Sequence, residues 1–330
     1  MDELIFFINR GVVGGLIIGS VYALGAVGVT LIFGILRFAH FAHGDMMTAS
    51  AFIALALAGL LSALGVSLPI PLVLALLPVV MALTALFAIG LDKAFYQPLR
   101  RRGAKPVVLV MASIGVTLML QGVIRLFGGT GSRDMYLEAP KAIYRIPTGG
   151  RPIILTEPQL VLIALTILSV IALHLFLTRS RLGKAMRAVS DNPDLARVTG
   201  IPIERVVKAT WAIGGGLAAI AGTMLAMDVQ LKPDLAYNIL LPIFAAAIVG
   251  GIGQPYGGIA GGYLIGFAET LAVFNFSVLL RPFRDWLPAG TEIPASLAMV
   301  PTEYRLVVPF FILVAVLIYR PTGIFKGRVF

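Results

Sequence analysis

The sequence predicts an all-α, polytopic membrane protein with about nine transmembrane helices, and three observations support this fold class. Apolar residues account for 58% of the 330 residues, and the mean hydropathy is +0.95. Charged residues account for only 13%, against roughly 25% in soluble domains. Apolar runs long enough to cross a bilayer, which takes about 20 residues, alternate with short polar connections. We therefore expect a single transmembrane domain over residues 1–330.

Nine apolar runs locate the expected spans, and their length and continuous apolar character favour helices. In chain order they cover 12–36, 46–64, 69–91, 107–127, 159–177, 209–227, 239–252, 257–276 and 305–319. Glycines recur every fourth residue from Gly11, just before the first run, to Gly19 within it, and from Gly258 to Gly266 in the eighth run. This spacing lets helix backbones approach closely in lipid, so we expect both sets on helix-packing faces.

The distribution of Lys and Arg indicates the orientation of the chain in the membrane. The net charge is +10, and the cations gather in the connections 92–106 and 178–208 and in the C-terminal tail. Basic connections stay on the cytoplasmic side, and one parity of nine spans places all three there. The N-terminus then lies outside, together with 128–158 and 278–304. Because these cations lie between apolar spans, we expect a lipid bilayer and no nucleic acid as a partner.

The basic connection 178–208 predicts two short helices at the membrane surface. Leu182, Met186 and Val189 recur at helical spacing among basic residues, which is typical of an amphipathic helix. Asn192 is a suitable N-cap for a second helix, and Gly200 is a suitable end for it. An apolar and basic unit of this kind suits the groove of a soluble partner or the surface of anionic lipid. The residues alone leave both interpretations open.

Two interruptions divide apolar runs and form a faint internal repeat. The first covers 38–45 and contains His43-Gly44-Asp45, and the second covers 250–258 and contains Gly253 and Pro255. Paired Gly/Pro interruptions are a pointer to the path of a transported solute, whereas plain helix hairpins are the alternative. We expect His43 and Asp45 to satisfy broken backbone groups beside such a path.

One further ionisable residue stands inside an apolar run. Glu269 lies in the eighth run, where a titratable group is a functional candidate by default. Contact with solute and a structural hydrogen bond to a neighbouring helix are equally open for it. His40 and His43 are three residues apart, but Asp45 alone would not complete a metal site with them, so we expect no metal.

Several motifs are absent from the chain. There is no G-x-x-x-x-G-K-[ST] phosphate loop and no cysteine, so we expect no ATP hydrolysis by this chain and no thiolate chemistry. Gly251-Ile252-Gly253 lacks the spacing of a dinucleotide fingerprint. No set of nucleophile, base and orienting residue stands out either. We therefore expect neither an enzyme nor a bound cofactor.

A set of motifs in order along nearly the whole chain resembles the permeases of branched-chain amino acid ABC importers, the high-affinity Leu/Ile/Val family. In chain order they are GSVYAL at 19–24, GILR at 34–37, FAHGD at 41–45, GKAMRA at 183–188 with Asp191, GI at 200–201, AIVGGIG at 247–253, PYGG at 255–258 and RPTGIF at 320–325. One position departs from the pattern, because many relatives have Asn where this chain has His40. That departure leaves the solute open.

The resemblance implies a role for the segment 178–208 and a set of partners. It implies that this segment is the cytoplasmic coupling loop that inserts into a separate ATPase subunit. The residues it implicates in coupling are Gly183, Arg187, Ala188, Asp191 and Gly200. The implied partners are a second homologous permease, two ATP-binding cassette ATPase subunits and a periplasmic substrate-binding protein, which delivers the amino acid across a bacterial inner membrane.

Two other functions stay open at this point. Within the same family the solute is urea, a short amide or another amino acid, because the binding protein sets most of the choice. Outside it, an ion-coupled secondary transporter would use Glu269 or His43 as a proton relay. The first interpretation needs an ATPase partner, and the second does not.

Overall fold

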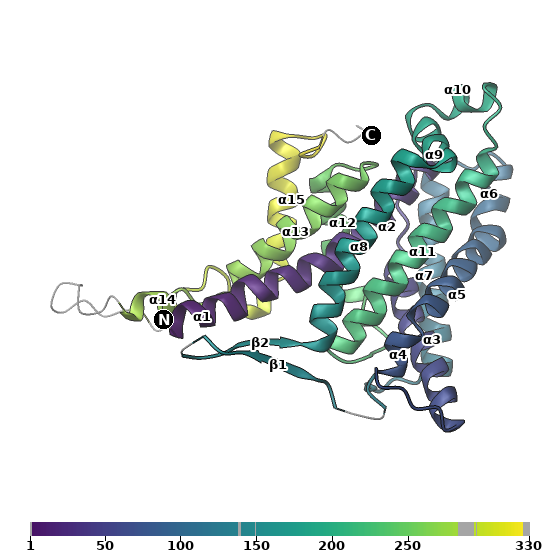
Figure 1. The fold of residues 1–330 in the computed structure, drawn as a ribbon. Coiled ribbons are helices and arrows are strands. Elements are labelled where there is room, and N and C mark those ends of the chain that lie inside the picture. The colour runs from purple at the N-terminus through teal and green to yellow at the C-terminus, as the bar shows by residue number, and fades with distance from the viewer. Residues whose placement is uncertain (1, 138–139, 149, 283–293, 295, 326–330) are drawn as a thin grey trace.

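The computed structural model describes residues 2–137, 140–148, 150–282, 294 and 296–325, and these form a helical bundle (Figure 1). The long helices are α2 (Gly14–Leu36), α3 (His43–Ala63), α5 (Leu77–Leu91), α7 (Pro106–Gly128), α8 (Glu157–Arg179), α11 (Ile203–Asp228), α12 (Tyr237–Gly250), α13 (Pro255–Ala272) and α15 (Val307–Tyr319). The shorter elements are α1 (Asp2–Phe7), η1 (Ile8–Val13), α4 (Leu72–Ala75), η2 (Asp92–Tyr96), α6 (Gln97–Arg101), α9 (Arg181–Asp191), α10 (Pro193–Val198), α14 (Ser277–Leu280), η4 (Thr302–Tyr304) and the strands β1 (Ile143–Ile146) and β2 (Ile153–Thr156).

Each of the nine expected spans overlaps one of the long helices, so the all-α membrane fold is confirmed. In the described part of the chain, six helical segments are long and apolar enough to cross a bilayer. The first is a continuous rod of 35 residues that joins α1, η1 and α2. The other long helices are shorter or less apolar. α12, with 14 residues, is about 21 Å long, less than the roughly 30 Å of a hydrocarbon core.

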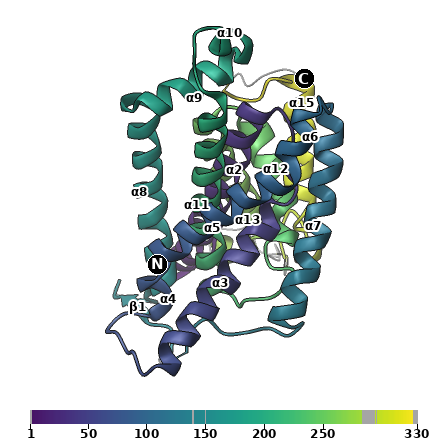
Figure 2. The same ribbon diagram turned by 90° about the vertical axis from the view of Figure 1, so that its right-hand side faces the viewer.

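Two helices form the centre of the bundle. α2 and α11 are buried along most of their length, whereas α5, α7 and α8 expose much of theirs. Figure 2 shows α8 on one side of these central helices and α7 on the other. α2 packs against α13, α11, α12 and α8, and α11 packs against α5 and α3.

The expected glycine faces lie between α2 and α13. Gly266 leaves no room for a Cβ, because that atom would lie 2.5 Å from the backbone of Gly19. Gly262 meets the backbone of Ala23 in the same way, and Gly258 lies against Ala26. Missing side chains therefore let the two helices approach to backbone contact, as the four-residue spacing predicts.

The connections before and after α7, residues 92–106 and 128–158, contain regular structure that the sequence did not predict. Residues 92–101 are not a loop: the π-helix η2 and α6 extend the span of α5 as one helix to Arg101. The connection 128–158 contains an antiparallel hairpin in which β1 pairs with β2. The start of the rod lies against this hairpin, because the Asp2 carboxylate accepts a hydrogen bond from the Arg151 N–H at 3.0 Å. Residues 283–293 and 295 of the connection 278–304 lie outside the described residues, and its expected extracytoplasmic position stays a prediction.

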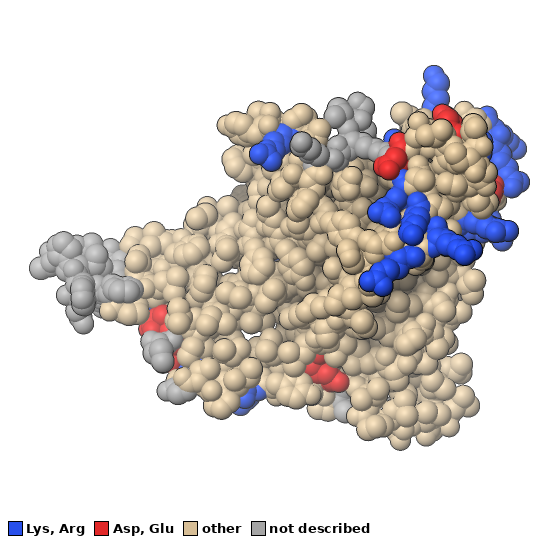
Figure 3. Space-filling model, turned by 45° about the horizontal axis from the view of Figure 1, so that its top comes forward, with Lys and Arg blue, Asp and Glu red and all other residues tan. Residues whose placement is uncertain are grey.

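The bundle has one basic end. α6, α9 and α10 lie there, together with the described end of the tail, opposite the hairpin (Figure 1). Figure 3 shows the Lys and Arg side chains gathered over this end. Its exposed cations are Lys93, Arg101, Arg102, Lys105, Arg179, Arg181, Lys184, Arg187, Arg197, Arg205, Lys208 and, in the tail, Arg320. The two basic connections therefore share one end, as the predicted parity requires, whereas Lys326 and Arg328 lie outside the described residues.

Candidate functional site

The predicted amphipathic helix of residues 178–208, the predicted coupling segment, is α9. The Ser180 hydroxyl caps its start by accepting a hydrogen bond from the Gly183 N–H at 2.8 Å. Met186 and Val189 are buried against the bundle, while the basic residues Arg181, Lys184 and Arg187 of the same helix are exposed. A side chain at Gly183 would overlap the Phe176 carbonyl at the end of α8. α9 is therefore fixed closely to the end of that helix.

The second predicted surface helix is α10, and its ends match the predicted signals. Asn192 Oδ1 accepts hydrogen bonds from the N–H groups of Asp194 at 3.1 Å and Leu195 at 3.0 Å. Gly200 follows the helix with φ of +82°, a conformation that glycine adopts without strain. Asp191 and Gly200 are exposed, and Ala188 is half-buried on α9. The Asn192 cap and the Gly200 turn therefore fix the two ends of α10, as the sequence predicted.

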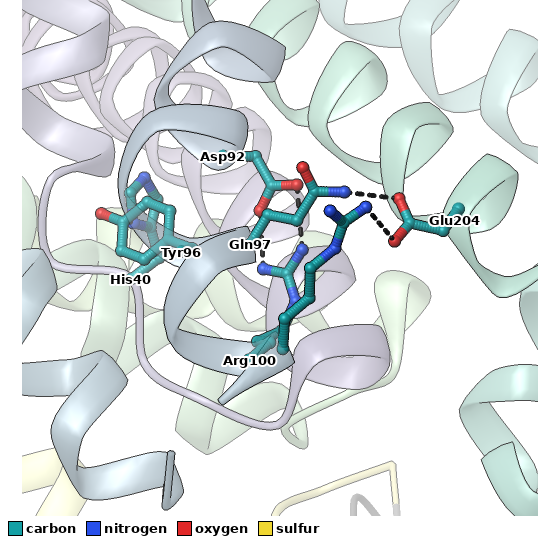
Figure 4. A network of polar contacts seen from close by, with 7 residues as sticks. His40, Asp92, Tyr96, Gln97, Arg100 and Glu204 are labelled. Atoms are coloured by element: carbon teal, nitrogen blue, oxygen red, sulfur yellow. Dashed lines mark hydrogen bonds and ion pairs between the residues drawn. The ribbon is translucent and has the colours of Figure 1, made fainter. Parts of the chain in front are cut away.

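A polar network joins this segment to the helical extension of α5 (Figure 4). The exposed Glu204, near the start of α11, accepts a hydrogen bond from Gln97 Nε2 at 2.7 Å and pairs with Arg101 at 3.5 Å. On the same extension, the Arg100 guanidinium binds both carboxylate oxygens of Asp92, at 2.6 and 2.9 Å. The sequence predicts only a basic loop at 92–106, so it does not predict these contacts between Glu204 and the extension of α5.

The first break, residues 37–42 between α2 and α3, is packed with aromatic rings. Phe38 and His40 are buried, and His40 Nδ1 lies 3.2 Å from the hydroxyl of Tyr96. Tyr96 stacks on Trp211 of α11 with ring centroids 5.3 Å apart. The break also reaches α9, since Arg37 Nη2 donates to the Ser190 carbonyl at 3.0 Å. His40 therefore links the break to the extension of α5.

The expectation that His43 and Asp45 satisfy the broken backbone is wrong. Both side chains are fully buried, and none of their polar atoms has a hydrogen-bond partner among the described residues. Ser113 of α7 takes that role: its hydroxyl accepts from the Phe41 N–H at 3.2 Å and lies 3.3 Å from the Ala39 carbonyl. Asp45 faces other polar side chains of α7, and these are Thr117, Gln121 and Arg125. His43 packs against Gly28, where a Cβ would lie 2.5 Å from its ring.

The second break, residues 251–254 between α12 and α13, is built from backbone. Gly251 and Gly253 have φ of +116° and +81°. The chain tail completes it, because Ile324 N–H donates to the Val249 carbonyl at 2.9 Å and Phe325 N–H donates to the Gly250 carbonyl at 3.1 Å. These bonds satisfy carbonyls at the end of α12, which a helix end otherwise leaves without partners.

A pocket joins the coupling segment to the second break. Its volume is about 150 Å³, and its walls come from α2, α8, α9 and the start of α13. Arg187 and Asp191 line it from α9, and Gly253 and Pro255 line it from the break. Residues that the sequence predicts for coupling and for the break therefore share one cavity.

Glu269 does not line this pocket, and its contacts are with residues that do not line it either. It is 2% exposed and accepts a hydrogen bond from the Tyr22 hydroxyl at 2.8 Å. Arg305, just before α15, forms an ion pair with the same carboxylate. A buried charge needs such partners, so these contacts account for Glu269 as a link between α2, α13 and the start of α15.

In the described part of the chain no group of three or more His, Asp or Glu side chains gathers as a metal site would require. The ring centroids of His40 and His43 are 6.2 Å apart.

Comparison with known proteins identifies relatives of the whole chain. A 326-residue alignment with the high-affinity branched-chain amino acid transport system permease protein BraD of Pseudomonas aeruginosa shows 29% identity and covers 98% of this chain and 97% of that protein. LivH of Escherichia coli K12, which has the same description, is 28% identical over 98% of this chain and 97% of its own length. A probable branched-chain amino acid transport permease of Methanocaldococcus jannaschii is 28% identical over 94% of this chain and 90% of its own.

No solved structure matches the chain significantly. The family described as branched-chain amino acid transport system, permease component, matches residues 11–317. That match includes both helix breaks and the whole coupling segment. The chain is thus a multi-pass membrane protein that belongs to the family of permease components of branched-chain amino acid transport systems.

Proposed function

We propose that the chain is one permease subunit of a binding-protein-dependent ABC importer for branched-chain amino acids. It forms the translocation path together with a second, homologous permease and relies on two separate ATPase subunits. One observation carries the proposal: α9, the first of two capped surface helices at the basic end, shares a pocket with a helix break, and α10 follows it directly. The names of the full-length relatives supply the solute class.

The proposed orientation places the basic end in the cytoplasm of a bacterial cell and the N-terminus outside the inner membrane. Lys and Arg near the ends of membrane spans favour the cytoplasmic side, and the described part of the basic end holds twelve exposed ones. The binding protein then delivers solute at the hairpin end. α9 and α10 face the ATPases, with Gly183, Arg187, Ala188, Asp191 and Gly200 in the contact. His43, Gly44, Asp45, Gly253 and Pro255 mark the breaks beside the path.

The contacts of Glu269 weigh against an ion-coupled secondary transporter. A proton relay needs a carboxylate that is able to change its charge, whereas Glu269 is held by the Arg305 guanidinium and the Tyr22 hydroxyl. Removing its charge would leave Arg305 without its partner, which is costly in a low-dielectric site. We therefore assign Glu269 a structural role. ATP hydrolysis by the separate ATPase subunits then drives transport.

Reconstitution in liposomes tests the proposal. The chain is purified alone and with its candidate permease, ATPase and binding-protein partners, and uptake of radiolabelled leucine is measured. We expect uptake only with all partners and ATP in the lumen. Uptake by the chain alone would overturn the proposal. Calorimetry of the binding protein with leucine, urea and acetamide then separates the solutes, and preference for urea or acetamide would replace the amino acid.

A further inference from the structure

The residue that follows α2 has an unusual backbone conformation. In the part of the chain that the structure describes, Arg37 is the one residue other than glycine with a positive φ, at +60° with ψ of +30°. Helices often end in this left-handed conformation, and Gly or Asn usually occupies the position because other side chains raise its energy. Such a cost persists only where surrounding contacts favour the residue, so it points to a role for the Arg37 side chain.

The Arg37 side chain reaches the last turn of α9. Its Nη2 donates a hydrogen bond to the Ser190 carbonyl at 3.0 Å, across 153 positions of sequence. Carbonyls in the last turn of a helix lack partners inside it, and the N–H four residues on, that of Asp194, donates to Asn192 Oδ1 instead. A cation at this end also complements the helix dipole. Arg37 therefore caps the C-terminal end of α9 from the end of α2.

The same turn of α9 meets the second break across the end of α2. A Cβ placed on Gly34 would lie 3.3 Å from the Ser190 hydroxyl oxygen and 3.5 Å from both the Cα and the carbonyl oxygen of Gly253. Gly34 precedes Arg37 by about one helical turn, so this junction lies beside the hydrogen bond. Three elements that are distant in sequence, α9, the end of α2 and the second break, therefore adjoin one another around Gly34.

The two ends of α9 are held by different helices. At its start, Gly183 lies against the Phe176 carbonyl of α8. At its end, Arg37 ties it to α2, and the largely exposed α10 begins just after Ser190. A force on this surface segment would therefore reach α2 through the hydrogen bond of Arg37 and the packing at Gly34.

We propose that Arg37 is a positioning residue for coupling. It joins the last turn of α9 and the end of α2 into one unit, and that unit abuts Gly253 of the second break. When an ATPase displaces α9, the displacement then reaches the break instead of being lost in a movement of α9 alone. The role in coupling rests on the proposed function, whereas the contact between Arg37 and α9 does not.

The ratio of ATP hydrolysed to leucine transported tests this role, because a merely structural defect lowers both rates together. Arg37→Asn removes the guanidinium and keeps a residue that tolerates the left-handed conformation. Arg37→Lys keeps a charged donor, and Arg102→Asn removes an exposed cation of the same basic end. In liposomes with all partners, we expect the ratio to rise at least about fivefold in Arg37→Asn and to stay within about twofold in the other two variants. An unchanged ratio in Arg37→Asn, or an equal rise in Arg37→Lys, would overturn the proposal.

A disulfide in place of the hydrogen bond gives a second test. The chain has no cysteine, and the distance from a Cβ at Gly34 to the Ser190 hydroxyl oxygen permits a disulfide between Gly34→Cys and Ser190→Cys. In the Arg37→Asn background, oxidation should return the ratio to within about twofold of the native value, and reduction should raise it again. Mass spectrometry confirms the disulfide. A ratio that does not respond to its formation would contradict the role of the contact in coupling.

Hydrogen exchange in the assembled complex without nucleotide separates this proposal from the proposed function. Exchange over residues 186–192 should rise at least about tenfold in Arg37→Asn and stay unchanged in Arg102→Asn, whatever solute the complex transports. Unchanged exchange in Arg37→Asn would overturn the contact. If exchange rises but leucine uptake needs no ATP, the importer assignment fails and the contact stands. If uptake needs ATP and the ratio is unchanged, the positioning role fails and the importer stands.

Discussion

The two helix breaks differ in what holds them. The first is filled by rings, since His40 lies against both Tyr96 and Trp211 in a fully buried cluster. The second has glycines and is closed by backbone hydrogen bonds from the chain tail to the end of α12. Close packing fixes one geometry, whereas two hydrogen bonds at a helix end can be exchanged for water. The first break thus serves as a fixed support, and the second is the one suited to movement.

Replacement of Trp211 by Ala should have the largest effect, because it empties the buried cluster of the first break. Loss of a buried Trp costs about 3–5 kcal/mol, and denaturant unfolding in mixed micelles measures that loss. Trp211→Phe is the matched control and should retain most of the stability. A loss below about 1 kcal/mol for Trp211→Ala would show that rings do not hold this break.

At the second break, Gly250→Val tests the dependence on backbone contact. A Cβ at this position would overlap the Gly257 carbonyl of α13, and overpacking costs about 1–3 kcal/mol. Gly59, whose Cβ would meet nothing within 4 Å, provides the control Gly59→Val. Equal unfolding free energies for the two variants would contradict the close approach of α12 and α13.

Removal of residues 320–330 tests the tail as part of the second break. It deletes the two backbone bonds to Val249 and Gly250, each with a net contribution of about 0.5–1.5 kcal/mol. Hydrogen exchange measured by mass spectrometry should rise at the end of α12 and stay unchanged at Trp211. Uniform exchange over both breaks would show that they are not held independently.

The smallest effect is expected at the side chain of Gln254. It is exposed within the second break and makes no side-chain cap, so Gln254→Ala should change the unfolding free energy by less than about 0.5 kcal/mol. Denaturant unfolding in mixed micelles measures this change, and Trp211→Ala, measured in the same way, should show a much larger loss. A cost above 1 kcal/mol would mean that side chains support the second break as well.

Local signals in the sequence predicted much of this molecule. Apolar runs located all nine long helices, and capping residues such as Asn192 located the ends of the surface helices, because these features depend on neighbouring residues. The glycine spacing indicated the packing faces of α2 and α13 for a similar reason. Small residues on one face of a membrane helix let another helix approach closely.

The missed features are pairings between distant residues. Ser113 bonds the backbone of the first break from 72 positions away, and Arg305 reaches Glu269 across 36 positions. Nothing local in a single sequence marks such partners. The hairpin was also missed, because its strands have four residues each and neither strand has a fully buried residue, so the alternation that half-buried strands show is absent.

The contact between the first and the eighth expected spans has a consequence for biogenesis. The Ser20 hydroxyl and the Tyr22 hydroxyl lie on α2, and their partners Tyr263 and Glu269 follow 243 and 247 residues later. A nascent chain synthesised at about 5–20 residues per second holds these groups in the bilayer for many seconds before α13 emerges. During that interval they lack their final hydrogen bonds, which lipid does not replace. α2, one of the two central helices of the folded bundle, therefore depends on temporary partners during insertion until α13 emerges.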